Sequence, residues 1–153
     1  MAFTGRPGET TFATAGSKHI KFWYPDQMKG EKGLFQNKAE QTSFACVAYD
    51  DKGVCYTGGC NSMIYVWPSK ELQTAIKVHN GGFICALRFA AGNLYSGGKD
   101  GNIVVTDTAT LTVKKTLSYD GILIRAIDVV GMKALIGLRN GSIILADAAS
   151  GAK

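Results

Sequence analysis

Short stretches of alternating apolar residues follow one another along this chain, separated by polar turns that contain glycine. The same unit, small residues, then a turn, then an apolar strand, recurs as TAGSKHIKFW, TGGCNSMIYVW, SGGKDGNIVVTD and IGLRNGSIILAD. Alternation of this kind is typical of β-strands, and Asp100-Gly101 and Asn140-Gly141 are typical of two-residue hairpins. No window has helical periodicity. We therefore predict an all-β protein.

The pattern predicts short strands that come in cycles of four. From residue 43 onward the predicted strands are 43–49, 54–58, 63–67, 74–78, 84–89, 93–97, 103–107, 112–117, 124–130, 133–137 and 142–147. Equivalent strand positions fall at Trp23, Trp67, Thr106 and Ala146, which lie 44, 39 and 40 residues apart. Four strands in a repeat of this length indicate the blade of a β-propeller.

The ends of the repeat pattern predict a partial ring. Two complete blades are expected, at 41–79 and 80–119. The first unit, 1–40, has room for only the tail of an inner strand in Met1 to Thr4, and the last unit, 120–153, lacks a full fourth strand. We expect residues 1–153 to form a single partial β-propeller of about three and a half blades, completed within a longer natural protein or by self-association.

Composition agrees with a globular protein and lowers the expectation of a metal or cofactor. The chain is 46% hydrophobic and 19% charged, with a formal net charge of +5 and no run of like charges. Its four cysteines lack the paired close spacings of a zinc site. Cys46, Cys55 and Cys85 are predicted to be small buried apolar residues on strands, and Cys60 lies in a turn. Reduced thiols and the absence of a signal-peptide pattern favour the cytoplasm.

The third repeat resembles those of the WD-repeat family. In that family a His before the first strand, a Ser or Thr on the second, an Asp in the next turn and a Trp on the third form a buried hydrogen-bond network. The third repeat has His79, Ser96 and Asp100 at these positions, with Thr106 in place of the Trp. The resemblance implies a partial WD-repeat β-propeller in which these side chains form a structural network.

The other repeats carry different parts of the same pattern. The second has Thr57 and Trp67, with Asn61 at the Asp position, and the first has Trp23. The fourth has neither the Trp nor the Asp. The resemblance gives both tryptophans a structural role in the same network.

Several longer segments resemble one branch, the echinoderm-microtubule-associated-protein-like family. These segments are SKHIKFW, KGLF, HNGGFICAL and ILIRAIDVVGMKALIG, at 17–23, 32–35, 79–87 and 122–137. The resemblance implies a cytoskeletal scaffold with tubulin or microtubules as its partner. The coiled-coil segment of that family has no counterpart in these residues.

One turn position is basic in three of the four repeats. The residue before the turn Asp or Asn is Lys99 in the third repeat, Arg139 in the fourth and Cys60 in the second, and Lys18 occupies the shorter turn of the first. Equivalent turns of a propeller lie on the same face. In the WD-repeat family this position contributes to a protein-binding face, which predicts that Lys18, Lys99 and Arg139 contact an acidic protein. Long cations are also common in exposed hairpin turns, so a purely solvated role is the alternative.

Enzymatic chemistry is not expected, and two other binding functions stay open. His19 and His79 are the only histidines, and the carboxylates are spread about a blade apart. Aromatic residues near lysines could stack on nucleic-acid bases, but Phe22 and Trp23 lie on opposite strand faces, which favours core packing. The alternatives to a microtubule-associated scaffold are therefore a generic WD-repeat adaptor and, less favoured, a nucleic-acid-associated propeller.

Overall fold

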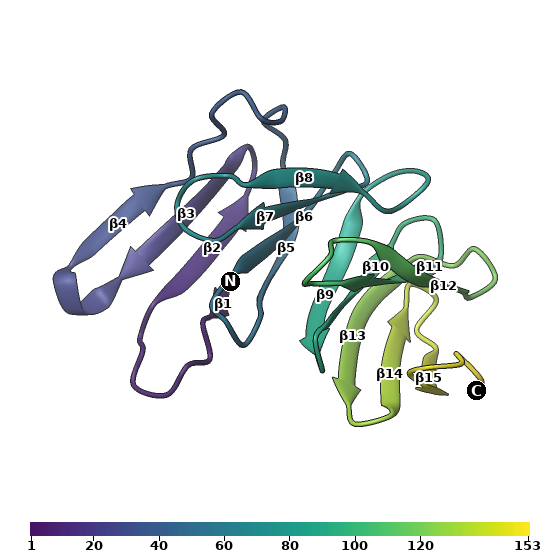
Figure 1. The fold of residues 1–153 in the computed structure, drawn as a ribbon. Coiled ribbons are helices and arrows are strands. Elements are labelled where there is room, and N and C mark those ends of the chain that lie inside the picture. The colour runs from purple at the N-terminus through teal and green to yellow at the C-terminus, as the bar shows by residue number, and fades with distance from the viewer.

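The computed structural model describes residues 1–153 and confirms the all-β prediction. Four antiparallel sheets follow one another along the chain, each hydrogen-bonded in chain order. Figure 1 shows them as separate sheets arranged along an arc, from β1–β4 at the purple end to β13–β15 at the yellow end. The arrangement is that of a partial propeller.

The bounds of the elements show where the repeat is full and where it is reduced. The first sheet contains β1 (Ala2–Phe3), β2 (Phe12–Gly16), β3 (His19–Tyr24) and β4 (Lys29–Lys32), with the short 3-10 helix η1 (Pro25–Gln27) before β4. The second contains β5 (Phe44–Tyr49), β6 (Cys55–Gly59), β7 (Met63–Trp67) and β8 (Thr74–Lys77). The third contains β9 (Ile84–Ala90), β10 (Asn93–Gly98), β11 (Asn102–Asp107) and β12 (Val113–Ser118), and the fourth contains β13 (Ile124–Val130), β14 (Lys133–Leu138) and β15 (Ile143–Asp147).

The predicted strands after residue 43 are all present, and one strand of the first sheet was missed. β4 has the sequence KGEK and carries none of the apolar alternation that indicates a strand. It is the outermost strand of its sheet and pairs only with β3, so it needs no buried side chain. A glycine at position 30 allows this pairing. A Cβ atom there would lie only 2.9 Å from the Trp23 ring, which is too close for a side chain.

The first strand of each sheet lines the inside of the arc. β1 contacts β5, β5 contacts β9, and β9 contacts β13. The pairing register shifts at the same place in three of these strands, which leaves Ala45, Cys85 and Arg125 without a partner residue. A bulge of this kind turns the extra side chain away from the ladder, so all three sheets present one unpaired residue at the same level.

Between neighbouring sheets the apolar faces pack into separate cores. Aromatic side chains dominate the core between the first two sheets, where Phe35 lies edge-on to Trp67 with ring centroids 5.2 Å apart. The later cores are mostly aliphatic: Ile64 packs with Ile84 and Leu94, and Ile103 packs with residues of the fourth sheet. Burying these side chains is the main driving force for stacking the sheets.

The cysteines are less buried than predicted. All four are free, and only Cys55 is fully buried, whereas Cys46 and Cys85 are partly buried and Cys60 is exposed. Cys46 and Cys85 lie on the innermost strands β5 and β9, and Cys85 is the bulge residue. No helix in the structure is both long and apolar enough to cross a membrane.

Candidate protein-binding face

A buried hydrogen-bond network joins the loop before β9 to the β10–β11 turn. His79 is 1% exposed, and its Nε2 atom lies 2.9 Å from the Ser96 hydroxyl. Its Nδ1 atom faces both carboxylate oxygens of Asp100 at 3.0 and 3.1 Å. The three residues that sequence analysis singled out are thus brought together. They tie a loop, a strand and a turn into one rigid unit.

The Asp100 carboxylate also organises the backbone around it. It accepts hydrogen bonds from the N–H groups of Asn80 at 3.1 Å and Asn102 at 3.2 Å. Burial disfavours the charged form, but the hydrogen bonds from Asn80, His79 and Asn102 outweigh this effect and lower the pKa of Asp100. The carboxylate is therefore held charged, and the turn that carries Lys99 is fixed in place.

In the second sheet, a different set of hydrogen bonds fixes the equivalent strand and turn. The indole N–H of Trp67 donates to the Thr57 hydroxyl at 3.0 Å, and the Trp67 side chain is fully buried. The Asn61 amide donates to the Tyr65 hydroxyl at 2.9 Å, and this hydroxyl donates to the carbonyl of Glu40. A Trp–Thr pair and an Asn–Tyr pair thus replace the histidine network.

Outside these two sheets the network is reduced. In the first sheet the Trp23 indole donates to Thr14 at 3.0 Å, in the same geometry as Trp67. In the fourth sheet Ile136 and Ala146 occupy the polar and Trp positions, and both are buried. In the third sheet Thr106 stands in the Trp position, and its buried hydroxyl has no hydrogen-bond partner.

All three predicted cations lie in hairpin turns at one end of the sheets. This end, called the turn face below, comprises the β2–β3, β6–β7, β10–β11 and β14–β15 turns together with the loops that precede β5, β9 and β13. The backbone N–H of Lys99 donates to Phe83 and that of Arg139 donates to Leu123, at 3.0 and 2.9 Å. Lys18 adopts a left-handed conformation, with φ 52°. The side chains of Lys18, Lys99 and Arg139 are exposed, and none forms a salt bridge.

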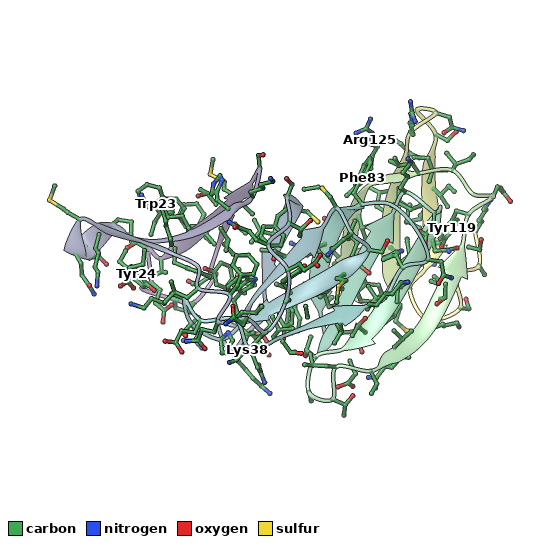
Figure 2. All side chains as sticks on the ribbon, turned by 90° about the horizontal axis from the view of Figure 1, so that it is seen from above. Trp23, Tyr24, Lys38, Phe83, Tyr119 and Arg125 are labelled. Carbon is green, nitrogen blue, oxygen red and sulfur yellow. The ribbon has the colours of Figure 1, made fainter.

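A fourth cation belongs to the turn face and was missed from the sequence. Arg125 is the bulge residue of β13, it is exposed, and it pairs with no carboxylate. Burial raises the pKa of the Cys85 thiol on β9. The positive charge of Arg125, on the neighbouring strand β13, acts in the opposite direction and lowers this pKa. Figure 2 shows Arg125 and Phe83 at the same edge of the molecule. Only the strand register identifies such a residue, because a bulge has no sequence signal here.

Phe83 adds an aromatic surface to the turn face. The ammonium of Lys99 lies 5.7 Å from the centroid of the Phe83 ring, within the range of a cation–π contact. The ring and the ammonium thus lie beside each other above the rigid His79 network.

At the opposite end of the sheets, Asp107 and Asp147 accept hydrogen bonds within their own turns. Asp107 accepts backbone hydrogen bonds from Ala109 at 2.8 Å and Thr110 at 2.9 Å, and Asp147 does the same for Ala149 and Ser150. The Lys114 hydrogen bond and these N–H groups hold the pKa of Asp107 well below its usual value. These carboxylates therefore organise turns at the opposite end, as Asp100 does on the turn face.

The second histidine lies outside the buried network. His19 is exposed, and its nearest polar partner is the Ser17 carbonyl at 3.4 Å. No three His, Cys, Asp or Glu side chains gather in a way that could hold a metal ion.

A curated relative and a solved structure illustrate what this chain is similar to. The ciliary WD repeat-containing protein ctxp80 of Euplotoides octocarinatus is 42% identical over 149 residues, covering 96% of this chain and 21% of its own length. The match supports the WD-repeat family. The chain thus spans about a fifth of the length of this relative.

The fold similarity extends to a designed protein. The crystal structure of the computationally designed Ika8 protein matches with a TM-score of 0.74 and 18% identity, covering 94% of this chain and 44% of that one. No protein-family model matches the sequence. The WD-repeat assignment therefore rests on the relative, and the similarity to the designed protein concerns the fold alone. Neither match bears on the finer resemblance to the echinoderm-microtubule-associated-protein-like family.

Proposed function

We propose that this chain is a non-enzymatic protein-interaction scaffold of the microtubule-associated WD-repeat type, which binds an acidic protein surface through its turn face. The observation that carries the proposal is a group of exposed cations without carboxylate partners, which includes Lys18, Lys99, Arg125 and Arg139. Tubulin is the first candidate partner, because the resemblance to the echinoderm-microtubule-associated-protein-like family implies it.

The geometry supports protein binding because hydrogen bonds hold the turns that carry Lys99 and Arg139. Backbone hydrogen bonds hold the Lys99 and Arg139 turns, and the Asp100 network braces the first of them. Rigid placement reduces the entropy lost when a partner binds. Two guanidinium groups, on Arg125 and Arg139, suit the paired oxygens of carboxylates. A surface of this kind selects acidic partners and accelerates their encounter.

The proposed location is the cytoplasm, in association with the cytoskeleton. The name of the ciliary relative fits this location. A generic WD-repeat adaptor that uses the same face for another acidic protein is the second candidate function, favoured by the general WD-repeat match alone.

Charge reversal tests the proposal. We expect Lys99→Glu to weaken co-sedimentation with polymerised tubulin about tenfold, and Lys99→Glu combined with Arg139→Glu to weaken it further, with a smaller salt dependence. Lys52→Glu is the matched control, because Lys52 is exposed in the β5–β6 turn at the opposite end. Equal tubulin binding by Lys99→Glu and Lys52→Glu would contradict the proposed contact.

The same variants separate the alternatives. A protein that does not bind tubulin but loses another acidic partner with Lys99→Glu is an adaptor of a different complex. A shift of nucleic acid with a steep salt dependence favours the nucleic-acid-associated propeller instead.

A further inference from the structure

Two Asn-Gly dipeptides lie on the turn face, and the structure holds them differently. Asn80–Gly81 belongs to the loop before β9, and Asn140–Gly141 forms the β14–β15 turn. All four residues are exposed. When glycine follows asparagine, its backbone nitrogen can reach the asparagine side-chain carbonyl, because glycine has no side chain to obstruct the approach. From the sequence alone the two dipeptides are therefore equally reactive.

The Asn140–Gly141 dipeptide is held by hydrogen bonds at both of its reacting groups. The Gly141 N–H donates to the Leu138 carbonyl at 3.1 Å. The side-chain oxygen of Asn140 accepts a hydrogen bond from the Ser142 N–H at 3.0 Å. Gly141 also has a left-handed φ of 86°, as a two-residue hairpin requires. Both hydrogen bonds have to break before the Gly141 nitrogen can reach the Asn140 side chain.

At Asn80–Gly81 the same two groups have no hydrogen-bond partner. Neither the Gly81 N–H nor the Asn80 side chain forms a hydrogen bond within the chain. A Cβ atom added at Gly81 would meet nothing within 4 Å, so the space around this residue is open. The Asn80 backbone N–H, in contrast, donates to the Asp100 carboxylate at 3.1 Å. This bond anchors the asparagine and leaves the peptide group that follows it free.

We propose that Asn80–Gly81 is a site of spontaneous deamidation, which introduces a carboxylate into the turn face. The Gly81 nitrogen gives up its proton and forms a bond to Asn80 Cγ, while the Cγ–Nδ2 bond breaks and ammonia leaves with that proton. Water then adds to one of the two carbonyl carbons of the cyclic imide and opens the ring. Addition at Cγ gives aspartate, and addition at the main-chain carbonyl carbon gives isoaspartate. Asparagine and water are thus converted to ammonia and one of these two products, without an oxidant or an enzyme.

The product changes the turn face in the loop that packs against Lys99. Gly82, in the same loop as Asn80, lies so close to Lys99 that a Cβ there would be 2.7 Å from the Lys99 Cδ atom. Deamidation adds a negative charge to this loop, and isoaspartate also lengthens the main chain by one carbon before Phe83. Under the proposed function, on which this consequence rests, the new charge opposes the binding of an acidic partner.

Peptide mapping by mass spectrometry tests the modification on the full chain. Samples incubated in neutral buffer are digested, and the mass gain from replacing NH2 by OH is followed at Asn80 and Asn140. Two hydrogen bonds hold the reacting groups of Asn140–Gly141 and none holds those of Asn80–Gly81. We therefore expect conversion at Asn80 to be at least about tenfold faster. Equal rates, or a faster rate at Asn140, overturn the proposal.

Two controls separate the effect of the fold from that of the dipeptide. In urea, where the hydrogen bonds at Asn140 are lost, the two rates should become similar, and a difference that persists unchanged overturns the structural explanation. Gly81→Ala should suppress conversion at Asn80 and leave Asn140 unaffected, because a Cβ obstructs the approach of the nitrogen. The variant should keep the fold, since Gly81 has no left-handed φ and lies in open space, and circular dichroism checks this. Undiminished conversion at Asn80 in Gly81→Ala overturns the imide route.

The consequence for binding is measured with Asn80→Asp, which carries the charge of the product. We expect this variant to weaken co-sedimentation with polymerised tubulin about threefold, less than Lys99→Glu does, because it adds a negative charge without removing a cation. Binding equal to that of the unchanged chain, with Lys99→Glu weakened, overturns the effect on the turn face. If the unchanged chain does not bind tubulin, the proposed function fails, whereas the mass measurement still decides the modification.

Discussion

The second and third sheets fill equivalent buried positions with different side chains and hydrogen bonds. In the second, Trp67 fills the space beneath the first sheet, and its indole donates to Thr57. In the third, Thr106 stands in the Trp position, and His79 binds Ser96 and Asp100 instead. The second sheet depends mainly on buried aromatic volume, whereas the third depends on a polar network with one charged member. The two sheets should therefore respond differently to mutation and to acid.

The largest expected effect is the loss of Trp67. We expect Trp67→Ala to lower the free energy of unfolding by about 3–5 kcal/mol, because a fully buried ring contacting Phe22, Phe35 and Phe44 leaves a cavity. Urea denaturation measures the change. Trp23→Ala is the matched control, since Trp23 makes the same bond to Thr but is only partly buried. A cost for Trp23→Ala as large as that for Trp67→Ala would show that burial is not what distinguishes them.

Removing the histidine of the third sheet should have a smaller effect. We expect His79→Ala to cost about 2 kcal/mol, because Ser96 and Asp100 lose their buried partner. His19→Ala should change stability by less than about 0.5 kcal/mol, since His19 is exposed. Chemical denaturation of both variants checks the difference. Indistinguishable stabilities would argue against a stabilising network.

Acid should affect the third sheet through Asp100. Its pKa in the folded chain lies below the usual 3.8, so the carboxylate stabilises the fold above that value, and the contribution is lost as the pH falls through the lower folded pKa. We expect Asp100→Asn to reduce the drop in melting temperature between neutral pH and the region below pH 3.8. Asp107 and Asp147, whose pKa values are also lowered, should leave the variant partly acid-sensitive. An unchanged pH profile in Asp100→Asn would exclude this contribution.

The smallest effect is expected from two equivalent Thr to Val changes. Thr57→Val should cost about 1 kcal/mol, because it removes the acceptor of the Trp67 N–H bond. Thr106→Val should be neutral or stabilise by up to about 1 kcal/mol, because its buried hydroxyl has no partner. Thermal melts of the two variants compare them directly. A loss of stability in Thr106→Val would mean that its hydroxyl contributes to the third sheet.

Much of the fold could be predicted because it is repeated locally. Every strand predicted after residue 43 is present with its ends shifted by one residue at most, since alternation and turn dipeptides act over a few residues. β4 was missed because an outer strand needs no apolar face. Arg125 was missed because its exposure depends on a register shift between β13 and β14.

The sequence by itself determined the repeat length, the all-β class and the hairpin turns between the predicted strands, and its resemblance to the WD-repeat family singled out His79, Ser96 and Asp100. Only the tertiary structure decided which side chains meet across sheets. Phe35 packs on Trp67, the bulges expose Arg125, and Leu135 and Ile143 are left uncovered. The physical reason is that periodicity reports which face of a strand is apolar, whereas the burial of that face depends on whether another sheet lies against it.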